Sequence, residues 1–417
     1  MVIYNIAIYL LKVSAHISAL LNAKARAFVN GRAQLFLRLE EAFKEQTSAV
    51  AWFHCASLGE FEQARPLIER FKQELPAYKI LLTFFSPSGF EIRKNYPHAD
   101  FIFYLPWDTP ANARRFIATT RPAIALFIKY EFWHNYIHEL SVHGIPLLSV
   151  SAIFRNDQVF FKPYGKLLKS MLYQFDHFFV QNTESADLLK SIGISRVAVS
   201  GDTRFDRVWQ ILQENREIPL VERFKGDQKI FIIGSCWPED FHLLAPFIYE
   251  QHKRLKFIIA PHEIDDSFLS HMENELNVKH VRYSKAAEDA AWADVLIIDS
   301  IGLLPKLYRY ATYAYVGGAL GKGLHNILEA ACHGIPVFFG NKNYRKSREA
   351  TDLILRGGAF EVGNYPELNK KFERFVTNPE TYQLARDITK SYVTENLGAT
   401  KMIMDYCHQS LSGITLP

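Results

Sequence analysis

The sequence predicts an α/β protein with two Rossmann-like, doubly wound parallel-sheet domains that face a central cleft, preceded by an apolar helix. Three observations predict this class. The chain has 417 residues, enough for two or three domains with large cores. Short apolar runs alternate with longer amphipathic ones, and this rhythm stops between Gly201 and Lys229 and then restarts. A composition of 48% hydrophobic and 22% charged residues excludes disorder and collagen-like fibres.

Charge and cysteine content exclude further classes of protein. Against 44 acidic residues the chain has 48 basic ones, and a net charge of +4 is too small for its length to indicate nucleic-acid binding. The four cysteines are far apart and form no CxxC pair, which argues against a disulfide scaffold and a zinc ribbon. Reduced thiols in a cytosolic protein fit best.

The first element is an apolar segment over residues 2–23, in which Lys12 is the one formal charge. Its polar residues Asn5, Tyr9, Lys12 and His16 fall on one stripe of a helix. Such a stripe favours a helix that lies in the membrane interface over a lone membrane span, and an ordinary first helix stays open as a third interpretation. No basic residue precedes the apolar run, so a secretory signal is disfavoured. A basic collar suited to anionic headgroups follows at Lys24, Arg26, Arg32 and Arg38.

Buried strands and amphipathic helices then alternate through the first half of the chain. We expect strands over Ala49–His54, Lys79–Phe84, Phe101–Tyr104, Ala123–Ile128, Pro146–Val150 and His177–Val180. We expect helices over Glu60–Glu74, Ala111–Thr119 and Trp133–Val142.

The second half repeats the pattern. Its expected strands are Ile230–Ile233, Lys256–Ala260, Val295–Ile298, Tyr313–Val316 and Pro336–Phe339. Its expected helices are Asp240–Gln251, Leu303–Tyr310 and Asn326–Cys332. We therefore divide the chain into residues 1–40 (helix and collar), 41–205 (N-terminal domain) and 206–417 (C-terminal domain), whose last helix is a candidate to pack back on the N-terminal domain.

Ligands of open α/β sheets bind beyond the carboxyl ends of the strands, so the turns at these ends are candidate sites. After the first strand, Ser57 and Gly59 precede Glu60, a carboxylate at a helix start that could act as a base or simply cap the helix. The turn with Ser88 and Gly89 offers hydroxyl and backbone donors for an anion or a sugar, or is a plain capped turn. Further on, Lys129 and Glu131 are expected on one side of an extended segment, either as a functional pair or as a surface salt bridge.

The second half has a glycine-rich loop between a strand and a helix, with GGxxGxG spacing from Gly317 and Gly318 onward. Such a loop can wrap a phosphate, with His325 and Asn326 expected in the first helical turn and Glu329 on the same face, placed to accept from ribose hydroxyls. A glycine-rich connection with a buried His–Glu pair is the alternative. Two turns, at Gly234–Ser235 and Pro261–His262, support the site. No HxxxH, HExxH or DxD ligand pair occurs in these loops, so we expect no metal site.

Several blocks together resemble a known family. They are HCASLGE (54–60), the Ser88–Gly89 turn, KYEFW (129–133) and GGALGKGLHNILEA (317–330), with smaller matches at Asn22–Ala25, Gly31–Arg32, Val180–Gln181 and Val199–Asp202. In order along nearly the whole chain, they resemble the signature blocks of bacterial 3-deoxy-D-manno-octulosonic acid (Kdo) transferases of lipopolysaccharide synthesis.

The resemblance implies a GT-B glycosyltransferase, inverting and metal-independent, at the cytoplasmic face of the bacterial inner membrane. It would transfer Kdo from CMP-Kdo, a substrate rather than a cofactor, to a lipid A precursor such as lipid IVA, and it would contact anionic inner-membrane lipids. Its implied catalytic residues are Glu60, as the base, and Glu131. The implied acceptor-side residues are Ser57, Gly59, Ser88, Gly89 and Lys129. The implied donor-side residues are Gly234, Ser235, Pro261, His262, Gly317, Gly318, His325, Asn326 and Glu329. A GT-B enzyme that uses a UDP-sugar and a non-catalytic nucleotide-binding membrane scaffold are the alternatives.

Overall fold

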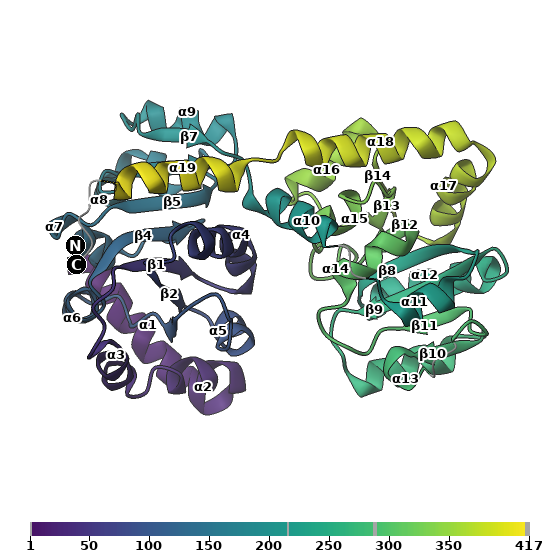
Figure 1. The fold of residues 1–417 in the computed structure, drawn as a ribbon, viewed down its shortest axis with the longest axis horizontal. Helices are drawn as coiled ribbons and strands as arrows, with labels where there is room; N and C mark the ends of the chain where they lie inside the picture. The colour runs from purple at the N-terminus through teal and green to yellow at the C-terminus, as the bar shows by residue number, and fades with distance from the viewer. Residues whose placement is uncertain (1, 215–216, 287–289, 413–417) are drawn as a thin grey trace. The chain divides into compact units, whose positions relative to one another are not determined.

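The computed structural model describes residues 2–214, 217–286 and 290–412. The chain forms two compact units, shown in Figure 1. Unit 1 comprises Met1–Arg207 and Leu397–Pro417, and unit 2 comprises Val208–Asn396. Each unit has its own parallel sheet and its own core, and helix α10 (Thr203–Gln213) crosses from one to the other.

Unit 1 contains, in its described part, a seven-stranded parallel sheet in the order β3-β2-β1-β4-β5-β6-β7. The strands are β1 (Val50–Cys55), β2 (Lys79–Phe84), β3 (Phe101–Tyr104), β4 (Pro122–Ile128), β5 (Leu147–Ala152), β6 (His177–Val180) and β7 (Val197–Val199). Its helices are α1 (Val2–Leu21), α2 (Ala23–Asn30), α3 (Leu35–Phe43), α4 (Leu58–Glu74), α5 (Pro87–Arg93), α6 (Pro110–Thr120), α7 (His134–Val142), α8 (Lys166–Leu172), α9 (Thr183–Ser191) and α19 (Ala399–Leu411).

Both faces of this sheet are buried, because successive side chains of each strand point to opposite faces. Trp52 packs with Phe116 of α6 on one face, and Phe53 packs with Phe71 of α4 on the other. The C-terminal helix α19 joins the α4 face, where its Ile403 is fully buried in the same cluster. Because helices cover both faces of the sheet, the sequences of its strands are apolar at almost every position.

Unit 2 repeats the architecture with a described sheet in the order β10-β11-β9-β8-β12-β13-β14. The strands are β8 (Lys229–Cys236), β9 (Leu255–Pro261), β10 (His280–Arg282), β11 (Val295–Ile297), β12 (Ala311–Val316), β13 (Val337–Gly340) and β14 (Ala359–Val362). The helices are α11 (Pro219–Lys225), α12 (Pro238–Gln251), α13 (Asp266–Glu275), α14 (Leu304–Leu307), α15 (Leu328–Ala331), α16 (Arg348–Arg356), α17 (Tyr365–Thr377) and α18 (Pro379–Glu395). The predicted class, two Rossmann-like doubly wound sheets, is confirmed.

Three short strands, β7, β10 and β14, were not expected, and all three lie at sheet edges. An edge strand is flanked on one side only, so its residues are less buried and its apolar signal is weaker. The expected helix over Leu303–Tyr310 is wrong in extent: α14 ends at Leu307 and a 3₁₀ turn follows. The helix expected over Asn326–Cys332 begins only at Leu328.

Helix α1 lies on unit 1 through part of its polar stripe. The Tyr4 hydroxyl donates to Asp108 Oδ2 at 2.5 Å, and Asn135 Nδ2 donates to Asn5 Oδ1 at 3.0 Å. Ile8 is the buried residue of the helix. Its other large apolar side chains are exposed, from 45% for Leu11 to 91% for Leu21. The helix therefore turns polar groups to the protein and apolar groups away from it.

Three arginines of the basic collar make contacts inside unit 1. Arg26 Nε donates to the carbonyl of Ala19 at 3.2 Å, and an amino group of Arg38 donates to the carbonyl of Gly31 at 2.7 Å. Arg32 is enclosed by aromatic rings, with its guanidinium 4.0 Å from the centre of the Phe28 ring. These side chains hold the α1–α3 segment together.

Candidate active site

The candidate residues of unit 1 lie at the switch point of its sheet, between β1 and β4. From this point the strand order runs outward in both directions, so the loops that follow β1 and β4 diverge and leave room for a ligand. The β1 loop leads into α4 with Ser57 and Glu60, and the β4 loop contains Lys129 and Glu131. The sequence analysis expected candidate sites at the carboxyl ends of strands, and the structure shows that Glu60 and Lys129 follow the two strands that flank the switch point.

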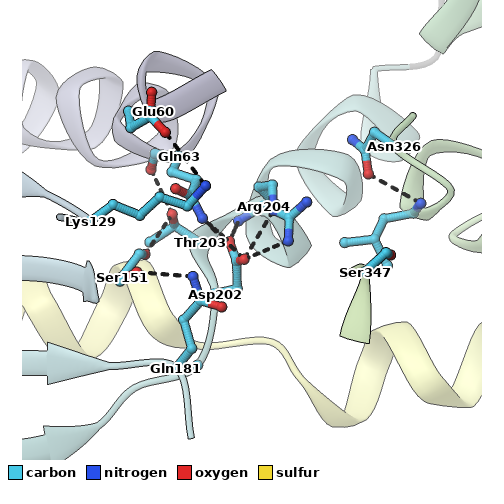
Figure 2. A network of polar contacts seen from close by, with 12 residues as sticks. Glu60, Gln63, Lys129, Ser151, Gln181, Asp202, Thr203, Arg204, Asn326 and Ser347 are labelled. Atoms are coloured by element: carbon cyan, nitrogen blue, oxygen red, sulfur yellow. Dashed lines mark hydrogen bonds and ion pairs between the residues drawn. The ribbon is translucent and has the colours of Figure 1, made fainter. Parts of the chain in front are cut away.

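Glu60 occupies the first turn of α4. Ser57 is the N-cap, and its hydroxyl accepts from the backbone N–H of Gly59 at 3.3 Å and donates to Glu60 Oε2. Glu60 Oε1 lies 3.5 Å from Lys129 Nζ. Figure 2 shows the two side chains pointing toward one another. The Glu60 side chain is 17% exposed, so its carboxylate is held by neighbours and remains accessible.

Lys129 and Glu131 do not share one side of an extended segment, and that expectation is wrong. Lys129 has a φ of +66°, in the left-handed region, which turns the chain sharply after β4. Its ammonium pairs with Glu60. Neither a Lys129–Glu131 surface salt bridge nor a shared face forms.

Glu131 belongs to a buried polar cluster behind this turn. Its Oε2 lies 3.1 Å from His54 Nε2 and accepts from Trp133 Nε1 at 2.6 Å. His54 Nδ1 lies 2.8 Å from the hydroxyl of Thr83 on β2. Buried polar groups need such partners, and this cluster links β1, β2 and the β4 loop. Glu131 is therefore tied to β1 and to Trp133, its carboxylate does not contact Glu60, and its catalytic role stays a prediction.

The Ser88–Gly89 turn is a capped helix start. Ser86 caps α5, and its hydroxyl lies 2.6 Å from that of Ser88. A Cβ at Gly89 would lie 2.3 Å from the ring of Phe84, so Gly89 is required for packing of α5 on β2. Of Ser88 and Gly89, Ser88 has a side-chain hydroxyl that could bind a ligand.

A second polar network fixes α4, and sequence reasoning quoted its Asp202 within a motif without giving it a role. The buried Asp202 carboxylate accepts from Gln63 Nε2 at 3.1 Å and from Arg204 Nε at 2.9 Å (Figure 2). Burial acts to raise the pKa of Asp202, but the Arg204 guanidinium and the hydrogen bonds outweigh it and hold this pKa below its usual value. Thr203 donates to the Gln63 carbonyl at 2.6 Å. The turn of α4 that follows Glu60 is thus tied to the start of α10.

Unit 2 places its candidates at the corresponding switch point, between β8 and β12. A Cβ at Gly234 would lie 2.0 Å from the Tyr308 hydroxyl, and one at Gly317 would lie 2.2 Å from the Ser235 carbonyl. Both glycines are needed for close packing. Ser235, with a φ of +51°, and Gly318, with a φ of +96°, form the sharp turns beside them.

Asp240 holds the glycine-rich loop, and sequence reasoning missed it. Its fully buried carboxylate accepts from the backbone N–H of Gly318 at 2.8 Å, from that of Trp237 at 3.1 Å and from the Tyr315 hydroxyl at 2.8 Å. Burial raises the pKa of this carboxyl. The available signal was an acidic residue in the first turn of a helix that follows a strand.

The glycine-rich loop makes hydrogen bonds within itself that were not expected. The N–H groups of Gly321 and Gly323 donate to the carbonyl of Gly318, and Asn343 Nδ2 donates to the carbonyl of Gly321 at 2.6 Å. These two backbone N–H groups are therefore not available to a phosphate.

A row of stacked rings lies beside the loop. His325 stacks on His262 with ring centres 4.1 Å apart, and His262 stacks on Trp237 at 4.6 Å. Trp237 Nε1 donates to His325 Nε2 at 2.8 Å, and Lys322 Nζ lies 4.0 Å from the Trp237 ring centre. Burial, and the neighbouring His262, lower the pKa of His325 to about 4. A neutral His325 that accepts at Nε2 carries its proton on Nδ1.

Asn326 and Glu329 are close together, but not as expected. His325 and Asn326 precede α15 and are not in its first turn. Asn326 Nδ2 donates to Glu329 Oε1 at 3.3 Å, while its Oδ1 accepts from the N–H of Leu328. Pro261 ends β9 next to His262. Within the described residues, no group of three or more His, Cys, Asp or Glu side chains is placed to hold a metal ion.

Known proteins resemble this chain in sequence. Residues 32–207 match a family described as 3-deoxy-D-manno-octulosonic-acid transferase (kdotransferase). The chain is 28% identical over 344 residues to the 3-deoxy-D-manno-octulosonic acid transferase of Aquifex aeolicus, covering 81% of this chain and 89% of that protein. It is 26% identical over 371 residues to the transferase of the same name from Haemophilus influenzae, covering 85% of each.

Solved structures show the fold. The UDP-GlcNAc 2-epimerase of Neisseria meningitidis superposes with a TM-score of 0.61 at 15% identity, covering 87% of this chain and 99% of that one. MurG of Acinetobacter baumannii superposes with a TM-score of 0.54 at 13% identity, with the same coverage. Both support the GT-B type of fold, and the two transferases named above match in sequence over 81% and 85% of the chain. Along most of its length, the chain therefore resembles bacterial 3-deoxy-D-manno-octulosonic acid (Kdo) transferases, which are glycosyltransferases.

Proposed function

We propose that the protein transfers Kdo from CMP-Kdo to a lipid A precursor, lipid IVA, in lipopolysaccharide synthesis and releases CMP. The observation that carries this proposal is the accessible Glu60 carboxylate, held by Ser57 and Lys129 at the switch point of unit 1. A general base is the one group that an inverting glycosyl transfer requires on the acceptor side. Similarity to proteins named as Kdo transferases supports the sugar that is transferred.

On the acceptor side, Glu60 would take the proton of an acceptor hydroxyl. The hydroxyl oxygen then attacks the anomeric carbon of Kdo from the face opposite the leaving group, which inverts the configuration. The network of Gln63, Asp202 and Thr203 keeps α4, and with it Glu60, in a fixed place. A carboxylate whose support is already ordered loses little conformational freedom when the substrate binds.

On the donor side, the bond between the anomeric carbon and the CMP phosphate breaks, and the electron pair leaves with CMP. The developing negative charge needs donors that are already oriented. Neutral His325 offers its Nδ1–H, Lys322 supplies a cation at the Trp237 ring, and Ser235 supplies a hydroxyl. Asn326 and Glu329 remain candidates for the ribose. These groups can stabilise the leaving phosphate without a metal or another cofactor, which is part of the proposal.

The proposed place of the reaction is the cytoplasmic face of the bacterial inner membrane, with α1 as the contact. An 18-residue window within Val2–Leu21 has a mean hydropathy of 1.4, and by length and composition the helix could cross a membrane. Its polar contacts with Asp108 and Asn135 hold it along unit 1, and its exposed apolar side chains favour a helix that lies in the bilayer surface next to anionic lipids.

The test is the mass of the product after incubation with CMP-Kdo and lipid IVA. We expect lipid IVA to gain Kdo, CMP to be released, and EDTA to leave the rate unchanged. Inhibition by EDTA that Mg²⁺ reverses would contradict the metal-free mechanism. Release of UDP from a UDP-sugar, with no reaction of CMP-Kdo, would contradict the donor. No product from any nucleotide sugar would favour the scaffold alternative.

A further inference from the structure

A pocket of about 560 Å³ lies in unit 1 between α1, the α2–α3 segment and the segment from β3 to α6. Among the described residues that line it are Lys12, His16, Arg32 and Arg115, and no Asp or Glu. None of these four residues belongs to the active site proposed above.

Arg32 is a cation without a counter-charge. Its guanidinium donates to the carbonyls of Phe28, Phe85 and Leu105 at 2.7–3.0 Å. Four aromatic rings surround it, and within the described part of the chain no carboxylate lies within ion-pair distance. Burial lowers its pKa to about 10. A buried charge that only dipoles and ring faces compensate is costly, and an anion in the pocket would offset part of that cost.

Lys12 adds a second uncompensated cation. It is half-buried on α1 and, in the described structure, makes no side-chain hydrogen bond or ion pair. Arg115 differs, because its Nε forms an ion pair with Glu40 Oε1 at 2.7 Å. Two cations without carboxylate partners therefore line one pocket, which indicates an anionic ligand.

The surroundings of the pocket indicate that the anion is attached to a lipid. Leu37, which lines it, is 62% exposed. On α1, the neighbouring Val13 and Leu20 are 56% and 75% exposed. A free inorganic anion would make no use of this apolar border, whereas a phospholipid has acyl chains that would cover it.

We propose that this pocket binds the phosphate headgroup of an anionic phospholipid, whose acyl chains lie beside the exposed face of α1. This site rests on the proposed membrane contact of α1. Anionic lipid would then bind at one defined pocket, and not diffusely along the basic collar. It also places the bilayer near the acceptor side of unit 1. Trp107 of the pocket contacts Phe85 with ring centres 6.2 Å apart, and Phe85 contacts Trp133 of the Glu131 cluster at 4.6 Å.

The test compares Lys12→Gln with Lys24→Gln in the full chain. Lys24 is an exposed lysine of the collar that does not line the pocket. The probe is short-chain phosphatidylglycerol, titrated calorimetrically, with short-chain phosphatidylcholine and inorganic phosphate as further arms. We expect one phosphatidylglycerol per chain, an affinity about tenfold or more weaker in Lys12→Gln because a charge-assisted contact is lost, and no change in Lys24→Gln. Circular dichroism checks the fold of both variants.

A second measurement uses the unaltered protein. Phosphatidylglycerol should slow acetylation of Lys12, read by mass spectrometry, and leave that of Lys24 unchanged. Equal losses in the two variants, or equal protection of the two lysines, would show a diffuse collar and overturn the proposal. Inorganic phosphate that binds as tightly as phosphatidylglycerol would show a free-anion site and also overturn it. Neither measurement contains a sugar donor or acceptor, so failure of the Kdo-transfer proposal would not change the result.

Discussion

Glu60 differs from a carboxylate that only caps a helix in what surrounds it. A cap needs the backbone N–H groups of the first turn, whereas Glu60 accepts from a hydroxyl and faces the ammonium of Lys129. It also keeps 17% of its side chain exposed at the switch point of the sheet. Both features suit a base that meets a substrate.

Glu60→Gln should lower turnover roughly 10²–10⁴-fold, because the amide keeps the shape but cannot take the proton. Affinity for CMP-Kdo should change little. Initial rates with CMP-Kdo and lipid IVA, together with calorimetry, measure the two effects. The matched control is Glu62→Gln, since Glu62 lies two residues after Glu60, pairs with Arg93 and is 36% exposed. Wild-type turnover in Glu60→Gln would reduce Glu60 to a structural residue.

Trp237 should set the tautomer of His325. Its Nε1–H donates to His325 Nε2, so Trp237→Phe removes that donor and should move part of the imidazole proton from Nδ1 to Nε2. Nitrogen NMR of labelled histidine reports this shift directly. If Nδ1–H contacts the nucleotide, CMP affinity should fall roughly two- to tenfold. Trp292→Phe, at a tryptophan that is 55% exposed, is the control and should change neither. An unaltered His325 spectrum would contradict the assignment.

At the scale of the element, α1 has two chemically different sides with separate tasks. Tyr4, Asn5 and Ile8 attach it to unit 1, and the remaining apolar side chains face outward. Deletion of the whole helix would remove Tyr4, which donates to the buried Asp108 carboxylate. The deletion would therefore combine loss of membrane contact with damage to unit 1. Substitution of outward residues avoids this.

Leu10→Gln combined with Leu20→Gln should reduce binding to anionic liposomes by at least about tenfold, because two apolar side chains leave the acyl boundary. These leucines are 64% and 75% exposed, so the fold should be unaffected. Co-sedimentation measures the binding. As a control, Leu355→Gln with Leu384→Gln alters two leucines of unit 2 that are 85% and 61% exposed. Binding that falls equally in both pairs would place the membrane contact elsewhere.

At the scale of the whole molecule, the chain passes from unit 1 to unit 2 and returns. Helix α19 completes the α4 face of the unit 1 sheet with Ile403, Met404 and Cys407, all fully buried. The backbone N–H groups of Gly398 and Thr400 donate to Asp206 at 2.8 Å and 2.6 Å, which fixes the start of the helix. The stability of unit 1 therefore depends on residues nearly two hundred positions away.

Ile403→Ala should lower the free energy of unfolding of unit 1 by about 2–5 kcal/mol, the cost of a large-to-small change in a core. Hydrogen exchange followed by mass spectrometry should show faster exchange in the strands of unit 1 and an unchanged rate of exchange in unit 2. Met402→Ala on the same helix, where Met402 is 42% exposed, should have little effect. Faster exchange confined to unit 2 would show that α19 does not stabilise unit 1.

The strands that the sequence predicted and those it missed differ in burial. Central strands such as β1 and β4 are buried on both faces and read as continuous apolar runs. The three-residue edge strands β7 and β10 have no fully buried residue, so periodicity gives no signal for them. The sequence also placed the start of α15 too early: the helix begins at Leu328, and the N–H of Leu324 before it donates to the carbonyl of Asn343.

The sequence by itself determined the two sets of alternating strands and helices, the turns that follow the strands and the placement of Glu60 after β1, because local apolar patterns and turn residues specify strands and their ends. Only the tertiary structure decided which polar groups meet. Lys129 turns to Glu60 because its left-handed φ redirects the chain, and Glu131 turns inward to His54. Asp240 and Trp237 acquire their roles through contacts 78 and 88 residues away along the chain. Such pairings depend on how strands are ordered in a sheet, and spacing along a sequence does not encode that order.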